Sequence, residues 1–291
     1  MTDFITRFAP SPTGHLHLGH AFSALTVFAA AQKAGGRFLL RIEDIDTIRC
    51  KPEFEEAIFE DLDWLGLEWE APVRRQSEHF DAYRAGLERL KAMGVVYRCF
   101  KTRKEILEDI GRAPHHPGEG PEGVIYPGPA EPLSADAEAE KIAAGEPYAW
   151  RLSMAAVQQR LGDLSRLTFE ETGEGPNGET GICAIQPDLI GDAILARKDI
   201  GTSYHLAVTL DDATQNISHV IRGQDLFFAT TMHRILQALL DLPAAVYRHH
   251  DLLTGADGAR FAKRDKAQTL RSLREAGAEA ADIRQQLGFD W

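Results

Sequence analysis

The sequence predicts an α/β fold, in which helices cover a parallel sheet and a smaller α+β segment is inserted. Over residues 1–98, short apolar segments alternate with amphipathic helical segments. This order is typical of parallel strands joined by helical crossovers. The same regular pattern returns at about residue 203, beyond two glycine- and proline-rich stretches at 111–132 and 171–181 that indicate loops. The middle of the chain is therefore predicted to be an insert in the sheet-forming domain.

The first third of the chain predicts two strands and three helices. The segments 3–10 and 37–44 are short and mostly apolar, as expected of strands. A helix over 17–35 ends at a pair of glycines, which supply a C-terminal stop. A second helix over 51–67 opens with proline and acidic residues, and a third over 77–94 begins at a serine N-cap and stops at a glycine.

The last third predicts the other half of the main domain. The segment 203–223 reads as strand, turn, strand, and 227–242 reads as an amphipathic helix. The predicted boundaries are 1–99 for the first half of the main domain, 100–185 for the inserted subdomain, and 186–291 for the second half, which ends in short helices.

Composition limits the class of protein. The chain has 291 residues, lacks the run of about 18 apolar residues that a membrane span needs, and lacks a secretion signal at its N-terminus. Its three cysteines, Cys50, Cys99 and Cys183, are widely spaced, so we expect a cytoplasmic protein. We also expect it to act as a monomer. The net charge of −12 counts against a protein that coats nucleic acid, although basic clusters at 98–104 and 260–274 keep a nucleic-acid partner possible.

The stretch "FAPSPTGHLHLGHAFSAL" places rigid turn residues and histidines at the start of a helix. Pro12 and Gly14 shape a tight loop after a strand, and His17, Gly19 and His20 open the helix. A helix N-terminus attracts phosphate, and histidines there can donate hydrogen bonds to phosphoryl oxygens. A glycine leaves room for a planar ring to approach the backbone. The stretch predicts a nucleotide site, although it contains neither a P-loop nor the dinucleotide-binding glycine pattern.

The same stretch resembles the first signature of class I aminoacyl-tRNA synthetases in its glutamyl form, with residues 17–20 matching the H-I-G-H element. The segments "RIEDIDTIR" at 41–49 and "YHLAVTLDDATQNISHVIRGQDL" at 204–226 match two further blocks of that family. The resemblance covers about 1–98 and 195–275. It implies a Rossmann-like catalytic domain that activates glutamate with ATP and Mg²⁺.

The second class I signature, K-M-S-K-S, is matched by a variant segment after a G-A-D-G turn. Arg260 replaces its first lysine, alanine replaces its serine, and Lys263 remains. The resemblance implies that Lys263 neutralises charge on the leaving pyrophosphate. The residues that it assigns to catalysis are His17, His20 and Lys263, and those that it assigns to ATP are Pro12, Gly14, His17, Gly19, His20 and Lys263.

An acidic amino-acid substrate needs cations, and arginine holds a carboxylate through two parallel hydrogen bonds. The resemblance implies that Glu43 pairs with the substrate ammonium and that Arg7 and Arg222 hold carboxylate, with contacts from Ser11 and Tyr204. Weaker candidates near the nucleotide are His205, Asp212, Gln224 and Asp225.

Only 26 residues follow Asp265, too few for an independent anticodon-binding domain, which we expect to be absent. Truncated members of this family transfer glutamate to the queuosine base at the wobble position of tRNA(Asp). The expected partners are thus glutamate, ATP and tRNA(Asp) bearing queuosine. Two alternatives remain open: a truncated synthetase that charges tRNA 3′ ends, and a catalytically silent paralogue that binds glutamate or tRNA.

Many family members hold zinc in the insert through C-x-C, a tyrosine and a further cysteine. In this chain Cys99 is present, but Lys101 stands at the second position and Ala130 at the last, with Tyr126 between them. One thiolate and a phenol do not make a four-ligand zinc site. We therefore expect no structural zinc.

Overall fold

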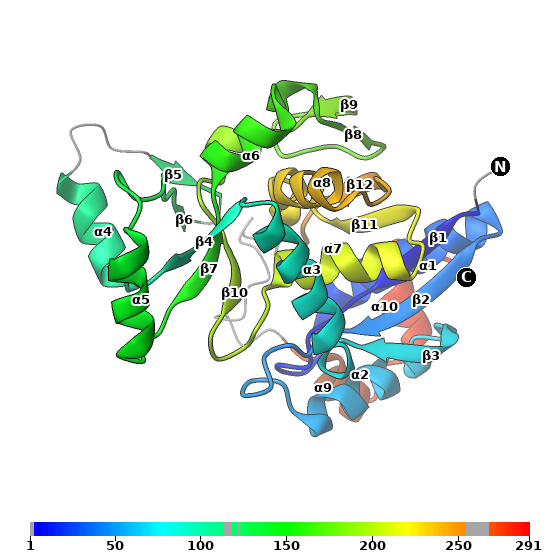
Figure 1. Ribbon diagram of the computed structural model, residues 1–291. Coiled ribbons are helices and arrows are strands. Elements are labelled where there is room, and N and C mark those ends of the chain that lie inside the picture. Colours follow the sequence, from blue (N-terminus) through cyan, green and yellow to red (C-terminus); the bar gives the residue numbers. More distant parts are fainter. Residues whose placement is uncertain (1–2, 113–117, 122, 254–267) are drawn as a thin grey trace.

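The computed structural model describes residues 3–112, 118–121, 123–253 and 268–291. Figure 1 shows a layered α/β body, from which the segment around β4, β7, α4 and α5 projects to one side. The first part of the chain forms β1 (Ile5–Phe8), α1 (Leu18–Ala34), β2 (Arg37–Ile42), α2 (Pro52–Trp64), β3 (Glu70–Arg75) and α3 (Phe80–Ala92).

The middle of the chain forms β4 (Val96–Cys99), α4 (Arg103–Arg112), β5 (Glu119–Gly120), β6 (Gly123–Val124), α5 (Ala135–Ala143), β7 (Ala149–Leu152), α6 (Met154–Leu161), β8 (Thr168–Glu171), β9 (Gly181–Ala184) and β10 (Ile194–Arg197). The last part forms α7 (Tyr204–Thr214), β11 (His219–Gly223), α8 (Ala229–Leu240), β12 (Val246–His250), α9 (Leu270–Glu275) and α10 (Ala280–Gln286). Short 3₁₀ turns are η1 (Gln76–Glu78), η2 (Leu164–Arg166), η3 (Pro187–Leu189) and η4 (Gln224–Leu226).

Parallel strands form the centre of the main domain, as the sequence predicts. β1, β2 and β3 pair in parallel, and β11, β12 and β8 do the same, with β9 antiparallel at the edge. The two sheets meet along β1 and β11, where the Ser218 amide donates to the Ile5 carbonyl at 3.0 Å. The carboxyl ends of β1, β2 and β11 therefore come close together, where α/β folds usually bind ligands.

A second, antiparallel sheet belongs to the middle segment. Its strand order is β10-β7-β4, with β7 in the centre and antiparallel to both neighbours. β10 therefore pairs with β7, although α6, β8 and β9 lie between them in the sequence. β8 and β9 join the main sheet instead. The division into 1–99, 100–185 and 186–291 stays a prediction.

Three local expectations differ from the structure. The sequence predicts a strand after Ser203, but this segment is α7. The Ser203 side chain caps the N-terminus of this helix by accepting a hydrogen bond from the Leu206 amide. This helix is buried on several sides, and an apolar run of its length does not distinguish a buried helix from a strand. β3 was not expected. Finally, α3 begins at Phe80 rather than after a Ser77 cap, because the Ser77 hydroxyl binds Asp44 instead.

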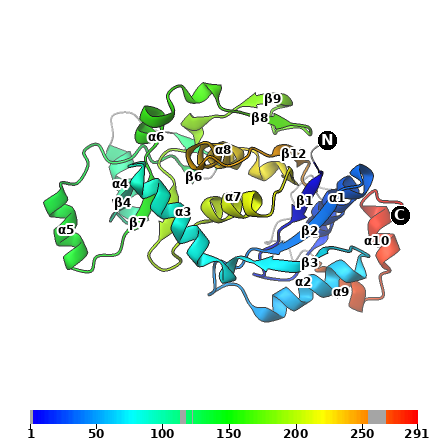
Figure 2. The same ribbon diagram turned by 45° about the vertical axis from the view of Figure 1, so that its right-hand side comes forward.

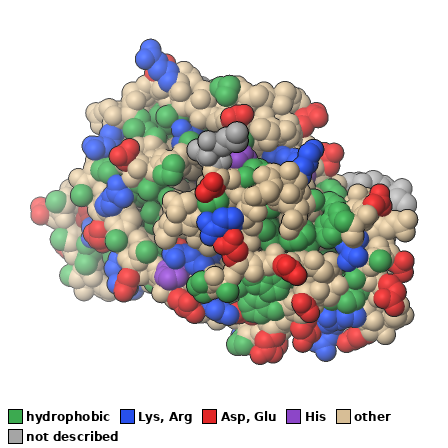
Figure 3. Space-filling model, turned by 90° about the vertical axis from the view of Figure 1, so that its right-hand side faces the viewer, with side chains coloured by type: hydrophobic (Ala, Val, Ile, Leu, Met, Phe, Trp, Pro, Cys, Tyr) green, Lys and Arg blue, Asp and Glu red, His purple; other side chains and the backbone are tan. Residues whose placement is uncertain are grey.

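The C-terminal helices α9 and α10 pack against α1 and α2 (Figure 2). The face shown in Figure 3 carries acidic and basic side chains intermixed. Among the helices that the structure describes, none combines the length and the hydropathy that crossing a membrane requires.

Asp61 on α2 is a buried carboxylate that faces α9. Its side chain is fully buried, and neither oxygen has a hydrogen-bond partner in the described part of the chain. The nearest cation is Arg274, with Nη2 3.8 Å from Oδ1. Burial raises the pKa of Asp61 from 3.8 to about 6. Ionising this group in the folded state thus costs free energy at neutral pH.

We expect Asp61→Asn to stabilise the protein at pH 7.5 by about 1–3 kcal/mol. The folded-state pKa of Asp61 lies above the unfolded-state value. The free-energy cost of ionising this buried carboxyl group therefore reaches its full value above pH 6 and disappears below about pH 4. The gain should therefore shrink at pH 4.5. Urea unfolding at both pH values measures it, with Asp63→Asn, an exposed position on the same helix, as the control. A gain that is equal at both pH values would contradict the assignment.

Candidate active site

The five residues predicted to bind glutamate come from segments that meet at one edge of the main sheet. Arg7 lies on β1, Glu43 directly follows β2, and Arg222 lies on β11. Ser11 is in the loop after β1, and Tyr204 is the first residue of α7. The fold therefore assembles the set from three strand ends, one loop and one helix start.

A cavity of about 340 Å³ opens at this edge. It is lined by residues of the segments 11–13, 43–50 and 194–204, and by Gln76. Three of the five candidates, Ser11, Glu43 and Tyr204, contribute to its wall. Its size and its mixture of polar and apolar walls suit a small polar ligand.

The charges of the other two candidates, Arg7 and Arg222, act on the phenol of Tyr204. Burial raises the pKa of Tyr204, Arg222 and Arg7 lower it, and Glu43 raises it further. Charges from β1, β11 and the end of β2 therefore all act on this one hydroxyl. The candidate site thus joins two guanidinium groups, one carboxylate and two hydroxyls.

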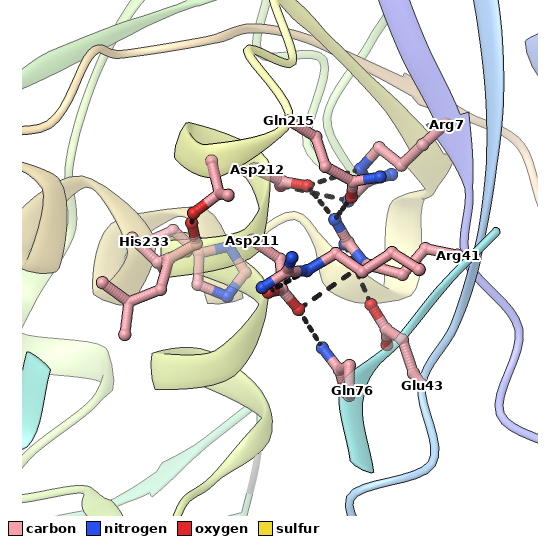
Figure 4. A network of polar contacts seen from close by, with 12 residues as sticks. Arg7, Arg41, Glu43, Gln76, Asp211, Asp212, Gln215 and His233 are labelled. Atoms are coloured by element: carbon pink, nitrogen blue, oxygen red, sulfur yellow. Dashed lines mark hydrogen bonds and ion pairs between the residues drawn. The ribbon is translucent and has the colours of Figure 1, made fainter. Parts of the chain in front are cut away.

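A buried ion-pair network fixes Arg7 and Glu43 (Figure 4). Arg7 donates to both carboxylate oxygens of Asp212, at 2.9 and 3.3 Å. Arg41, which is fully buried, donates to Asp212 at 2.7 Å and to Glu43 at 3.0 Å. Arg41 therefore connects the carboxylate that holds Arg7 to the carboxylate predicted to bind an ammonium group.

Opposing charges set the ionisation of this network. Burial acts to raise the pKa of Asp212, but Arg7 and Arg41 hold it below its ordinary value. Burial raises the pKa of Glu43, against the pull of Arg41 and Arg7. An incoming ammonium group would add a further positive charge beside Glu43 and favour its ionised form.

Asp211 anchors the network to the rest of the fold. It is fully buried and accepts from Arg74 at 2.7 Å, from Gln76 at 2.8 Å and from the hydroxyl of Tyr83 at 2.9 Å. Arg41 Nε lies 4.0 Å from the same carboxylate. The partners of Asp211 come from β2, β3, η1 and α3, so these elements are held together beneath the cavity.

Arg222 differs from Arg7 because its partners are neutral. It is 5% exposed and donates to His249 Nε2 at 3.1 Å, the Leu226 carbonyl at 3.0 Å and the Thr230 hydroxyl at 2.7 Å. Its Nη1 lies 3.3 Å from His233 Nδ1. Within the described residues, no carboxylate forms an ion pair with it. A buried cation without a counter-charge favours the binding of an anion.

His233 and His205 extend the contacts of Arg222 towards α7. Because arginine can only donate, His233 Nδ1 accepts from Arg222, and its Nε2–H faces His205 Nδ1 at 3.3 Å. Burial and the charge of Arg222 hold the pKa of His233 well below its usual value. The neutral ring is therefore compatible with the neighbouring cation.

The predicted ATP residues lie at the N-terminus of α1. His17 Nδ1 accepts from the Gly19 amide at 3.1 Å, and His20 Nδ1 accepts from the His17 amide at 3.2 Å. This reciprocal pair is a capping box made from two histidines. Since both Nδ1 atoms accept, both rings are neutral and carry their hydrogen on Nε2. Pro12 and Gly14 lie in the loop that leads to this helix.

Lys263, with the surrounding segment 260–264, lies outside the described residues. The chain that follows it returns to the start of α1. Leu270 donates to the Leu16 carbonyl at 2.8 Å, and Thr269 pairs with His17 as an isolated bridge.

The weaker candidates divide into two groups. His205 and Asp212 belong to the networks described above. Gln224 and Asp225 lie in η4, where Gln224 Nε2 donates to the Glu174 carbonyl at 2.9 Å. Sequence reasoning missed Arg41 and Asp211, although a charged residue between the apolar residues Leu40 and Ile42 was a usable signal for Arg41.

The residues around Cys99 do not suit zinc. Cys99 is buried with Ile106, Ile110 and Tyr126, and the charge of Lys101 acts on the Tyr126 phenol. Within the described ranges, no group of three or more His, Cys, Asp or Glu side chains could hold a metal ion. The expectation of no structural zinc stays a prediction.

Comparison with known proteins gives a consistent result. A family model described as the catalytic domain of class I tRNA synthetases (E and Q) matches residues 3–287. A Rhodobacter capsulatus protein named Glutamyl-Q tRNA(Asp) synthetase is 47% identical over 98% of this chain and 100% of its own length. A Symbiobacterium thermophilum protein of the same name is 38% identical over 95% of this chain and 83% of its own.

Among solved structures, a glutamate tRNA ligase from Elizabethkingia meningosepticum, crystallised with its amino acid, is similar with a TM-score of 0.76 and 25% identity. The match covers 98% of this chain and 60% of that one. The chain thus spans somewhat more than half the length of that ligase.

Proposed function

Because the chain belongs to the class I tRNA synthetases of the glutamate and glutamine group, we propose that it is a ligase that activates glutamate with ATP and transfers it to the queuosine base at the wobble position of tRNA(Asp). The observation that carries the proposal is the 47% identity to a Glutamyl-Q tRNA(Asp) synthetase over nearly the whole chain. Arg222 supports an acidic ligand, because it is buried, has no ion-pair partner among the described residues, and its charge acts on Tyr204 in the cavity wall.

In the proposed activation step, Glu43 binds the substrate ammonium, Arg7 and Arg222 hold its carboxylates, and the hydroxyls of Ser11 and Tyr204 complete the contacts. A carboxylate oxygen of glutamate attacks the α-phosphorus of ATP, and pyrophosphate leaves. The Nε2–H groups of His17 and His20 stabilise charge on the phosphoryl oxygens, and Lys263 neutralises the pyrophosphate.

In the proposed transfer step, a hydroxyl of the cyclopentene ring of queuosine attacks the carbonyl of glutamyl-adenylate. An ester forms and AMP leaves. The role of the protein is to hold the two reactants in position, since proximity alone can account for much of the acceleration.

We propose that Mg²⁺ enters as its complex with ATP, since this ion is commonly held through substrate phosphates. The protein is proposed to act in the cytoplasm, where tRNA is available, and as a monomer. Charging of tRNA 3′ ends is a second candidate, favoured by the similarity to a glutamate tRNA ligase.

We expect the purified protein to catalyse glutamate-dependent ATP–pyrophosphate exchange without tRNA, with much weaker exchange for glutamine and aspartate. We expect this preference because glutamine lacks a side-chain carboxylate for Arg222 and aspartate carries its own one methylene closer to the α-carbon. Absence of exchange, with or without queuosine-bearing tRNA(Asp), would refute the proposal and favour a silent binding protein.

A second assay identifies the acceptor. Radiolabelled glutamate is offered with tRNA(Asp) containing or lacking queuosine, and with queuosine-bearing tRNA(Asp) from which the 3′-terminal adenosine has been removed. Labelling that requires queuosine and survives trimming supports transfer to the base. Labelling that is lost on trimming would identify 3′-end charging instead.

A further inference from the structure

A buried acid–histidine pair lies behind Arg222 on the neighbouring strands. Glu171 ends β8 and His249 lies on β12, next to β11, which carries Arg222. The two side chains are 1% and 2% exposed. Neither was assigned a role from the sequence, and neither lines the cavity.

Glu171 is held rigidly by its own hydrogen bonds. Its Oε1 accepts from the backbone amides of His249, at 2.9 Å, and Gly173, at 2.8 Å. Its Oε2 lies 2.5 Å from His249 Nδ1. Although burial acts to raise the pKa of Glu171, the hydrogen bonds from His249 lower it below its usual value. The carboxylate is therefore ionised and fixed in one orientation.

The contact with Arg222 determines the tautomer of His249. Arg222 Nε donates to His249 Nε2 at 3.1 Å, and arginine cannot accept. Nε2 must therefore be unprotonated, which places the ring hydrogen on Nδ1, facing Glu171. Burial lowers the pKa of His249; the hydrogen bond to Glu171 acts to raise it and the charge of Arg222 to lower it, and the pKa stays below its usual value, so the neutral ring is favoured.

We propose that Glu171 is a positioning residue that holds His249 in the Nδ1–H tautomer, so that His249 Nε2 orients Arg222 to bind the ligand carboxylate. The identification of this ligand as glutamate rests on the proposed function. Glu171 acts through two other side chains and does not touch the ligand.

Glu171→Gln is expected to reverse the tautomer. The glutamine Oε1 would keep the two backbone amides, since both can only donate. Its Nε2–H₂ would then face His249 Nδ1, which would have to accept. The ring hydrogen would move to Nε2 and oppose Arg222 Nε–H, which would disturb the guanidinium.

Long-range ¹H–¹⁵N NMR of the unmodified protein tests the tautomer directly, with His249→Asn used to assign the ring signals. We expect hydrogen on Nδ1 in the wild type and on Nε2 in Glu171→Gln. Hydrogen on Nε2 in the wild type would overturn the inference. This measurement needs no substrate, so it stands even if glutamate is not the ligand.

Two replacements of His249 separate its contacts. Glutamine can place its Oε1 near the position of Nε2 and accept from Arg222, whereas asparagine places its amide near Nδ1 and keeps only the donor to Glu171. We expect His249→Asn and Glu171→Gln to raise the KM for glutamate about tenfold or more, the scale of losing a hydrogen bond to a buried charge. His249→Gln should have the smaller effect.

In these variants, kcat and the KM for ATP should stay within about threefold of the wild-type values. An interaction that stabilises the ground state and the transition state equally changes only the KM of its own substrate, here glutamate. His219→Asn, at the opposite end of β11 from Arg222, is the matched control and should leave KM unchanged. Equal KM values for His249→Asn and His249→Gln would refute the positioning role. A wild type without exchange would instead refute the proposed function.

Discussion

Replacing Arg222 by glutamine is expected to lower kcat/KM for glutamate-dependent exchange by about 10²–10³-fold, which corresponds to about 3–4 kcal/mol, the scale of breaking a buried ion pair. In the structure, the hydrogen-bond partners of this arginine are neutral groups. The ligand carboxylate is then its counter-charge, and in the variant that carboxylate would be buried without one.

The measurement is exchange kinetics together with glutamate-induced thermal stabilisation, which should be present in the wild type and absent in Arg222→Gln. Arg222→Lys should fall between them, because lysine keeps the charge but lacks the planar fork. Arg248→Gln, an exposed position on the adjacent strand, is the control. A loss of less than about threefold in Arg222→Gln would show that another group binds the carboxylate.

Replacing Arg41 by methionine is expected to destabilise the fold by about 3–5 kcal/mol. Arg41 is fully buried and pairs with Asp212 at 2.7 Å and with Glu43 at 3.0 Å. Among the described residues, removing it leaves Asp212 paired with Arg7 and leaves Glu43 without an ion pair. The pKa values of both carboxylates should rise, and the remaining stability should fall further as pH increases, because the buried groups must then ionise.

Urea unfolding at neutral pH measures this effect. The control is Arg37→Met on the same strand, where Arg37 is half exposed and pairs with Glu70 at 2.6 Å. A surface pair of this kind contributes less than about 1 kcal/mol. If the two variants lost the same stability, the buried network could not have the role described here.

The local sequence pattern was sufficient to predict many of the strands and helices of the main domain. Periodicity and stop signals predicted the first two strands and α1, and α1 does end at Gly35, which adopts a positive φ of 60°. They failed for the segment after Ser203, because a buried helix and a buried strand are both apolar. They also missed β3, in which three residues are exposed and the other three are only partly buried.

The candidate site, too, was predicted only in part from the sequence. Motif matching identified Arg7, Ser11, Glu43, Tyr204 and Arg222, and the fold brings these side chains to one edge of the sheet. Their roles as ligands of glutamate stay a proposal, and Lys263 lies outside the described residues.

By itself, the sequence determined the alternation of strands and helices, the start of α1, and the chemical types of the candidate side chains. Only the tertiary structure decided which of the charged side chains have an ion-pair partner. Arg41 and Asp212 are 171 positions apart, and Glu171 and His249 are 78 apart. Such partners leave no local periodicity, because their proximity depends on strand order and helix packing. Arg7 therefore has a carboxylate partner while Arg222 has none in the described part of the chain, a difference that could not be read from two arginines in the sequence.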